Sequence, residues 1–265
     1  MSFEQQLIRW RRELHQNPEL SLQEVATTAR IRDWLQSAGI APLPLELKTG
    51  AVAEVGQGER VVALRADIDA LPIEEATGLE YRSQTPGVMH ACGHDIHTSV
   101  ILGAALLLKA REASLPGRVR ILFQPAEENF GGAKTLIRAG ALEGVSVIFG
   151  MHNEPGLAVG EFATRGGAFY ANVDRFIIRV QGKGAHAARP HEGQDAILLA
   201  SQLIGALQGI ASREVNTLDS VVLSVTRIQG GNTWNVLPES VELEGTLRTH
   251  RTDVQQRVKT RGSEI

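Results

Sequence analysis

The sequence predicts an α/β protein with two domains: a larger one built on a mostly parallel sheet, and a smaller α+β one with a ferredoxin-like order of elements. Three observations support this prediction. Short apolar runs alternate with helical segments as far as residue 150, which is typical of a parallel sheet covered by helices. Near residue 175 the pattern changes to a β-α-β-β-α order. The chain has 265 residues, 43% of them hydrophobic, so it can bury the core of one large or two ordinary domains.

Two helices are expected at the start of the chain. Ser2 can cap the first, which ends at Pro18. Its apolar residues recur at helical spacing: Phe3, Leu7, Trp10 and Leu14. Ser21 and Glu24 have the spacing of a capping box, which predicts a second helix running to Gly39.

Strands and helices then follow in turn. In the first domain we expect strands over residues 51–55, 60–65, 119–123 and 145–149, and helices over 100–110 and 131–139. In the second domain we expect strands over 176–181, 221–228 and 241–249, a helix over 196–210, and the start of another at 251–258. The change of pattern places the domain boundary between residues 174 and 175. The second domain lacks the last strand of a ferredoxin-like fold.

Charge and composition exclude several classes of function. The 27 basic and 30 acidic residues give a net charge of −3, so the chain has no basic field for the phosphates of a nucleic acid. We find no apolar run of membrane-spanning length and no signal peptide. The single cysteine, Cys92, rules out an intrachain disulfide and fits a reducing compartment. We therefore expect a cytoplasmic protein that binds neither nucleic acid nor a membrane.

Side chains able to bind metals follow three of the expected strands. Asp67 and Asp69 come directly after the second strand of the first domain. Glu127 and Glu128 follow the third strand, and His152 follows the fourth. Because the carboxyl ends of parallel strands meet at one edge of a sheet, where α/β proteins build their sites, we expect these side chains to lie close together.

A further segment, residues 89–97, is rich in metal-ligating groups. These groups are His90, Cys92, His94, Asp95 and His97. Thiolate, imidazole and carboxylate together suit zinc or a similar divalent transition ion. Taken singly, Cys92 could be a small buried apolar residue and His152 an interior histidine. For His97 we favour such an ordinary role, as a local hydrogen-bonding group. The joint pattern favours a metal site.

Six motifs occur in order along the chain: LRADIDALP (64–72), MHACGHDIHT (89–98), FQPAEE (123–128), GMHNEP (150–155), GKGAHAARP (182–190) and NVLPESVELEGTLRT (235–249). They resemble the M20 metallopeptidase family, and within it the amidohydrolases that cleave N-acyl amino acids, such as hippurate hydrolase, N-acetyl-diaminopimelate deacetylase and the auxin-conjugate hydrolases. The resemblance implies an α/β catalytic domain at residues 1–174 that holds two metal ions. It also implies an inserted ferredoxin-like lid and dimerisation domain at residues 175–265.

The resemblance implies specific roles at the metal site. Four residues would ligate two divalent ions, zinc, manganese or cobalt: Cys92, His94, Glu128 and His152. Glu127 would be the general base that takes a proton from a metal-activated water. Asp69 would hold one of the ligands in place. The implied reaction is hydrolysis of the amide bond of an N-acyl amino acid, giving a carboxylate and the amino acid.

The resemblance also implies roles for the second domain. His186 would reach into the site of a partner subunit and stabilise the oxyanion, which makes the expected protein a homodimer. Asn235 and Arg248 would help to hold the substrate.

Two alternatives to this enzyme remain open. Members of the family continue past residue 265 and carry a further histidine ligand there, so the chain could be a truncated fragment that binds metal or dimerises without catalysis. A metal-dependent aminopeptidase or dipeptidase would share the same site chemistry.

Overall fold

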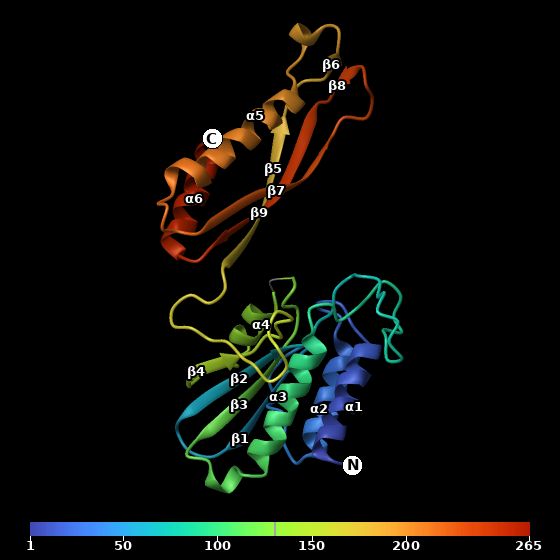
Figure 1. The fold of residues 1–265 in the computed structure, drawn as a ribbon, viewed down its shortest axis with the longest axis vertical. Coiled ribbons are helices and arrows are strands. Elements are labelled where there is room, and N and C mark those ends of the chain that lie inside the picture. The colour runs from blue at the N-terminus through green and yellow to red at the C-terminus, as the bar shows by residue number, and fades with distance from the viewer. Residues whose placement is uncertain (130) are drawn as a thin grey trace. The chain divides into compact units, whose positions relative to one another are not determined.

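Four strands form a mixed sheet in the N-terminal part of the chain, in the order β1-β3-β2-β4 (Figure 1). Their bounds are β1 (Ala51–Gly56), β2 (Val61–Asp67), β3 (Arg118–Gln124) and β4 (Val145–Gly150). β2, β3 and β4 run parallel, as expected, whereas β1 pairs antiparallel with β3. The direction of β1 follows from the short turn at residues 57–60, which reverses the chain before β2. The three parallel strands therefore end at a common edge.

The computed structural model describes residues 1–129 and 131–265, which form two compact units, Met1–Ala158 and Val159–Ile265. The expected domain boundary, between residues 174 and 175, lies inside the second unit. The first unit also contains α1 (Phe3–Gln16), α2 (Val25–Ser37), α3 (His94–Lys109), the 3₁₀ turn η1 (Glu112–Ser114) and α4 (Gly132–Arg138). Ser2 caps α1, as the sequence predicts.

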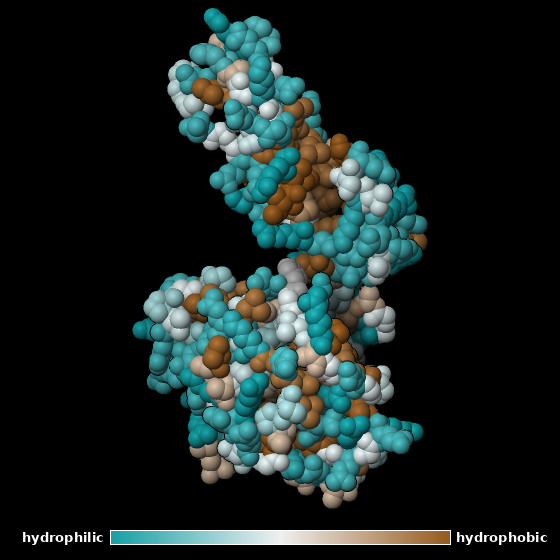
Figure 2. Space-filling view, turned by 180° about the vertical axis from the view of Figure 1, so that it is seen from behind, coloured by the Kyte–Doolittle hydropathy of each residue, from teal (hydrophilic) through white to brown (hydrophobic). Residues whose placement is uncertain are grey.

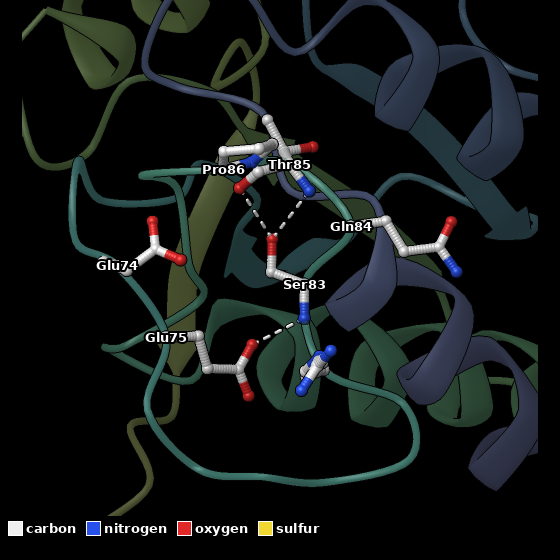
Figure 3. A pocket seen from close by; sticks show the side chains of 7 residues that line it. Glu74, Glu75, Ser83, Gln84, Thr85 and Pro86 are labelled. Atoms are coloured by element: carbon white, nitrogen blue, oxygen red, sulfur yellow. Dashed lines mark hydrogen bonds between the residues drawn. The ribbon is translucent and has the colours of Figure 1, made fainter.

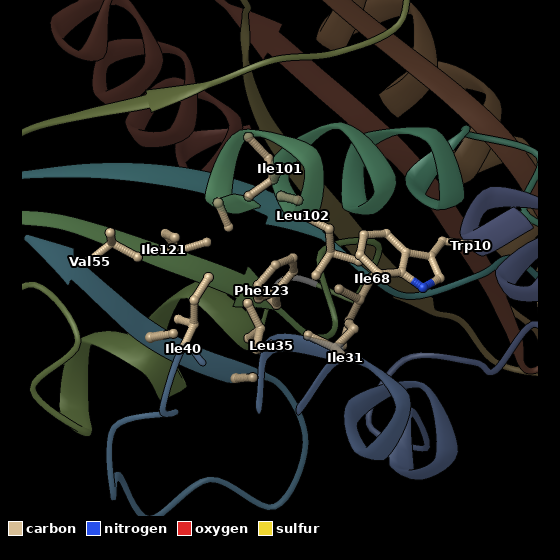
Figure 4. Packing of buried hydrophobic residues seen from close by; sticks show 14 residues of the cluster. Trp10, Ile31, Leu35, Ile40, Val55, Ile68, Ile101, Leu102, Ile121 and Phe123 are labelled. Carbon is tan, nitrogen blue, oxygen red and sulfur yellow. The ribbon is translucent and has the colours of Figure 1, made fainter. Parts of the chain in front are cut away.

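Residues of the sheet alternate between two hydrophobic cores. Phe123 of β3 packs with Trp10 of α1 and Leu102 of α3 on one face (Figure 4). The preceding residue, Leu122, packs with Leu136 of α4 on the other face. This period of two is the geometry of a strand, and each fully buried side chain of this size stabilises the fold by about 1.5–3 kcal/mol. Helices thus cover both faces of the sheet and hold its edge in place.

The expected capping box at α2 is wrong, because its two side chains bond elsewhere. Ser21 donates a hydrogen bond to Asp69 Oδ2 at 2.7 Å, and Glu24 Oε1 accepts one from the Ala126 N–H at 2.7 Å. Glu19 caps the helix instead, since its carboxylate accepts from two N–H groups in the first turn at 2.7 and 3.1 Å. The segment before α2 is therefore tied to the loops that follow β2 and β3.

The second unit has the predicted β-α-β-β-α order. Its elements are β5 (Asn172–Gln181), β6 (Ala185–His186), the 3₁₀ turn η2 (Pro190–Glu192), α5 (Ala196–Gly209), the π-helical turn η3 (Ile210–Glu214), β7 (Val221–Gly230), β8 (Val236–Leu237), β9 (Ser240–Thr249) and α6 (Thr252–Glu264). Three long strands form an antiparallel sheet in the order β5-β9-β7, and β6 pairs with β8 in a separate ribbon. Leu207 of α5 and Val254 of α6 pack with Leu223 and Leu247 of the sheet.

The sequence analysis expects no segment of membrane-spanning length, but one helical segment has that length and composition. Residues Ala196–Glu214 form a helix that is long and apolar enough, by length and composition alone, to cross a bilayer. Ala200 and Leu207 on one side of it are buried in the unit's own core, while Ile197 and Leu198 are about half exposed. Figure 2 shows that apolar side chains also reach the surface elsewhere in both units.

Candidate metal centre

The candidate site lies in the first unit, where the three parallel strands end. Asp67 is the last residue of β2, and Glu128 and His152 lie in the loops that follow β3 and β4. Cys92 and His94 flank the residue that caps α3 at its N-terminus. The expected clusters are therefore brought to one edge of the sheet.

Side-chain atoms able to bind a metal form three groups. Within each group these atoms lie no more than 4.8 Å apart. The groups are Cys92, His94 and His152; His94, Glu127 and Glu128; and Asp67, His94 and His97. His94 belongs to all three, so it stands where the clusters join. All four expected ligands and Glu127 belong to these groups, whereas Asp69, His90 and Asp95 belong to none of them.

His94 is held so that one ring nitrogen faces the cluster. The ring is buried, and its Nδ1 lies 3.2 Å from Asp69 Oδ1. Its Nε2 is buried without a hydrogen-bond partner among the described residues and lies 3.8 Å from Glu128 Oε1. An unpartnered buried nitrogen is costly in the absence of a ligand. A divalent cation would satisfy it, so the donor set fits a metal.

Asp69 holds His94 through a network of its own. Its Oδ2 accepts hydrogen bonds from the Ser21 hydroxyl at 2.7 Å and from the Glu128 N–H at 3.0 Å. Burial alone would raise the pKa of Asp69, but the hydrogen bonds with His94, Ser21 and Glu128 outweigh it and lower that pKa. The carboxylate thus stays charged and fixes the imidazole, as expected of a residue that holds a ligand.

The charge of His94 depends on its carboxylate neighbours. Burial disfavours the imidazolium, but the hydrogen bond with Asp69 and the charges of Asp67 and Asp69 raise the pKa of His94 to about 10. Without a cation this ring therefore carries a proton at neutral pH. A bound divalent ion would take the place of that proton, because metal ligands must be deprotonated.

Cys92 and His152 form the second pair of candidate ligands. The Cys92 Sγ lies 3.3 Å from His152 Nε2. The Nδ1 of His152 lies 2.8 Å from the backbone oxygen of Asn153. A carbonyl oxygen can only accept, so Nδ1 carries the proton and Nε2 presents its lone pair towards Cys92.

The two adjacent glutamates occupy a tight turn after β3. Ala126 has a positive φ of 47°, and its N–H is bonded to Glu24. A side chain at Gly132 would meet the backbone oxygen of Pro125 at 1.5 Å, so only glycine allows the chain to pass so close. Burial first, and the charge of Glu128 next, raise the pKa of Glu127.

Two residues near the candidate metal centre, Asp67 and His97, make hydrogen bonds that the sequence analysis did not predict. The buried Asp67 bonds to His97 Nδ1 at 2.6 Å and to Arg65 at 2.6 Å. Burial opposes its ionisation, but the hydrogen bond with His97 and the charges of His94 and Arg65 lower the pKa of Asp67 to about 2. The sequence analysis counted Asp67 among the side chains able to bind metals but gave it no specific role, and for His97 it favoured an ordinary hydrogen-bonding role.

The loop between β2 and α3 encloses a separate pocket of about 340 Å³ (Figure 3). In it the Ser83 N–H donates to Glu75 Oε2 at 2.6 Å. His15 joins this loop to α3, since its two ring nitrogens lie 3.1 Å from Glu75 and 2.8 Å from Asp95. The hydrogen bond with Asp95 outweighs burial and raises the pKa of His15. The residues lining this pocket are distinct from the metal-ligating groups.

The remaining predicted site residues lie in the second unit. His186 is in β6, opposite Val236 of β8, and its Nδ1 accepts a hydrogen bond from the Ala188 N–H at 3.1 Å. The backbone of Asn235 accepts from the residue after His186 at 3.0 Å, so these two residues are close neighbours. Arg248 is exposed on the central strand β9.

Comparison with known proteins gives consistent matches. Residues 63–248 match the family described as Peptidase family M20/M25/M40. The chain is 54% identical over 262 residues to an N-acetyl-L-cysteine deacetylase of Bacillus subtilis, an alignment that covers 98% of this chain and 63% of that protein. It is 47% identical over 246 residues to an N-acyl-L-amino acid amidohydrolase of Geobacillus stearothermophilus, covering 92% and 66%. The chain thus spans less than two thirds of the length of these two relatives.

A solved structure is also similar. The crystal structure of a dinuclear metal-binding peptidase of the M20 family from Bacillus subtilis superimposes with a TM-score of 0.82 at 47% identity, covering 98% of this chain and 68% of that one.

Proposed function

The chain belongs to peptidase family M20/M25/M40, and from this premise we propose that it carries the metal centre and general base of an amidohydrolase acting on N-acyl amino acids. The proposed reaction cleaves the amide bond and yields a carboxylate and a free amino acid. One observation carries the proposal: the buried, unpartnered Nε2 of His94 stands among thiolate, imidazole and carboxylate groups beside Glu127.

The proposed ligands are Cys92, His94, Glu128 and His152. Their mixture of sulfur, nitrogen and oxygen donors suits zinc, and also manganese or cobalt. Bound there, two divalent ions would polarise the amide carbonyl and lower the pKa of a water molecule. The similarity to a dinuclear metal-binding peptidase supports this stoichiometry.

Glu127 is the proposed general base. It lies in the same group as His94 and Glu128, and its pKa is raised by burial and by the neighbouring carboxylate. A raised pKa brings a carboxylate closer to the proton affinity that a base needs at neutral pH. Glu127 would accept a proton from water and deliver it to the leaving amine, while Glu128 serves as a ligand.

Asp69 and the second unit complete the proposal. Asp69 would keep the His94 lone pair directed at the metal, because it accepts the hydrogen bond from Nδ1. We propose that the second unit is the lid and dimerisation domain, in which His186 stabilises the oxyanion and Asn235 and Arg248 hold the substrate. The single free cysteine, Cys92, supports a cytoplasmic location.

The names of the relatives support the substrate class. A deacetylase of N-acetyl-L-cysteine and an amidohydrolase of N-acyl-L-amino acids both act on acylated amino acids by name. The similar crystal structure is described as a peptidase, which keeps a dipeptidase or aminopeptidase as a second candidate. Comparing hydrolysis of N-acetyl-amino acids with that of unblocked dipeptides separates the two.

Glu127→Gln tests the proposed base. The variant keeps the shape of the side chain, so we expect unchanged metal content and a loss of about 10²–10⁴ in kcat for an N-acetyl-amino acid. Glu128→Gln is the matched comparison, because removing the charge of a ligand should lower metal content as well as kcat. A loss of less than about tenfold in Glu127→Gln would show that another group is the base.

A further inference from the structure

We propose that His97 is a positioning residue that fixes His152 through the backbone of Asn153. The inference rests on the proposed function for the role of His152, while the hydrogen-bond chain itself stands on geometry. His97 is fully buried in the first turn of α3, and its ring centroid lies 4.6 Å from that of His152.

The two partners of His97 determine where its proton lies. The Asn153 N–H lies 3.0 Å from His97 Nε2, and a backbone N–H can only donate. Nε2 is therefore unprotonated, and the ring proton is on Nδ1, which lies 2.6 Å from Asp67 Oδ1. Asp67 thus fixes the tautomer of His97 that can accept from Asn153.

Asn153 passes this constraint to His152. Its N–H is held by His97, while its carbonyl oxygen lies 2.8 Å from His152 Nδ1. The bond to the carbonyl keeps the proton of His152 on Nδ1 and leaves Nε2 towards Cys92. Asp67, His97 and the backbone of Asn153 therefore together align the His152 ring. This arrangement is a longer version of the carboxylate–histidine pair found behind metal ligands.

The side chain of Asn153 makes a third contact with the site. A Cβ at Gly93 would meet its Oδ1 at 2.3 Å, so the amide packs directly on Gly93, the residue between Cys92 and His94. Gly93 also has a positive φ of 81°, which favours glycine. Moving Asn153 would therefore disturb both His152 and the segment that carries the other two candidate ligands.

The series of hydrogen bonds begins at Asp67, in the interior of the sheet, and ends in the loop after β4. Asp67 ends β2, the strand between β3 and β4, and is bonded to Arg65, which in turn bonds to Gln124 of β3 at 3.0 Å. Asn153 follows β4, the edge strand of the described sheet. The hydrogen bonds of His97 therefore connect the centre of the sheet to the loop that carries His152, a candidate ligand at the sheet edge.

The same bonds argue against His97 as a metal ligand, although its ring lies in a ligand-capable group with Asp67 and His94. Nε2 already accepts from Asn153, and Nδ1 carries the proton bonded to Asp67. Neither nitrogen offers a free lone pair to a cation.

Two substitutions at His97 separate its two hydrogen bonds. In His97→Gln the amide oxygen can reach the place of Nε2 and accept from Asn153. In His97→Asn the shorter amide can replace only Nδ1 and bond to Asp67. Ser99→Ala is the control for loss of a buried hydrogen bond in the same helix, since the Ser99 hydroxyl donates to the Asp95 backbone oxygen and leaves the bond between His97 and Asn153 in place.

Metal affinity of the 265-residue chain is measured by competition between Co²⁺ and a chelator, with the thiolate–cobalt absorption band as the signal for Cys92. We expect His97→Asn to weaken Co²⁺ binding about 10- to 100-fold, the range for outer partners of metal ligands. We expect His97→Gln and Ser99→Ala to stay within about threefold of wild type, because both keep the bond to Asn153. Equal weakening in the Gln and Asn variants would overturn the proposal.

A second measurement needs no metal. Long-range ¹H–¹⁵N spectra of the metal-free chain report the tautomer of each histidine, and we expect Nδ1–H for both His97 and His152. In His97→Asn the His152 signal should lose its single tautomer, whereas in His97→Gln it should keep it. A wild-type His97 protonated on Nε2 would overturn the proposal. A wild-type chain with these tautomers that bound no Co²⁺ would instead refute the proposed function and leave the hydrogen-bond chain intact.

Discussion

Replacing Asp69 with asparagine tests how the candidate centre holds its protons. In the wild-type chain burial disfavours the His94 imidazolium, but the hydrogen bond with Asp69 and the charges of Asp67 and Asp69 raise the pKa of His94 from 6.5 to about 10. This rise corresponds to about 5 kcal/mol in favour of the protonated ring. The hydrogen bond with Asp69 is the largest of the raising contributions. In Asp69→Asn this contribution is lost, so we expect a lower pKa of His94 and a larger neutral fraction of the ring at pH 8.

The assay counts the protons released when a cation binds. At pH 8 the wild-type His94 must lose its proton before Nε2 can bind Zn²⁺, whereas in Asp69→Asn a larger fraction of the rings is already neutral. Calorimetric titrations in buffers of different ionisation enthalpy give the number of protons released, and we expect fewer in the variant, by at most about one. Ser21→Ala is the control, because its hydroxyl contacts Asp69 but not His94. Equal proton release by wild type and Asp69→Asn would show that Asp69 does not hold the proton on His94.

Four further predictions follow from the same structure. Phe123→Ala should lower the free energy of unfolding by about 3–5 kcal/mol in urea titrations, because the ring is fully buried. Glu24→Ala should lower the free energy of unfolding by about 1–3 kcal/mol, because it leaves the buried N–H of Ala126 without its partner. An unchanged free energy of unfolding would contradict that contact. Because burial and Glu128 raise the pKa of Glu127, kcat/KM should fall at acidic pH with a midpoint above 4.5; a midpoint at or below 4.5 would count against Glu127 as the base. The raised pKa of His94 stabilises the metal-free fold below pH 6.5, so urea unfolding should become easier as the pH rises through about 10.

Sequence patterns predicted the framework of the site because each pattern reflects a local rule. Alternating apolar runs predicted β2, β3 and β4, and their parallel arrangement brings Glu127 and His152 to one edge. The segment with Cys92 and His94 was predicted to join them, and the structure places it there. The mixed direction of the sheet was not predicted, because strand pairing depends on contacts far apart in the chain.

Side-chain partners were harder to predict than backbone elements. Ser21 and Glu24 have the spacing of a capping box, and the same residues would satisfy that pattern whether they cap a helix or bond across the fold. Their partners, Asp69 and Ala126, lie 48 and 102 residues away in sequence. His97 raises the same difficulty, because a histidine at the start of a helix gives no indication of which backbone N–H it will accept from.

We propose that this chain assembles a metal centre from Cys92, His94, Glu128 and His152. The most direct measurement is the metal content per chain of the purified 265-residue protein, beside a Cys92→Ala, His152→Ala double variant. We expect about two tightly bound divalent ions in the wild type and a clear loss in the folded double variant. A folded wild-type chain that retains no metal, or a double variant that binds as much as the wild type, would contradict it.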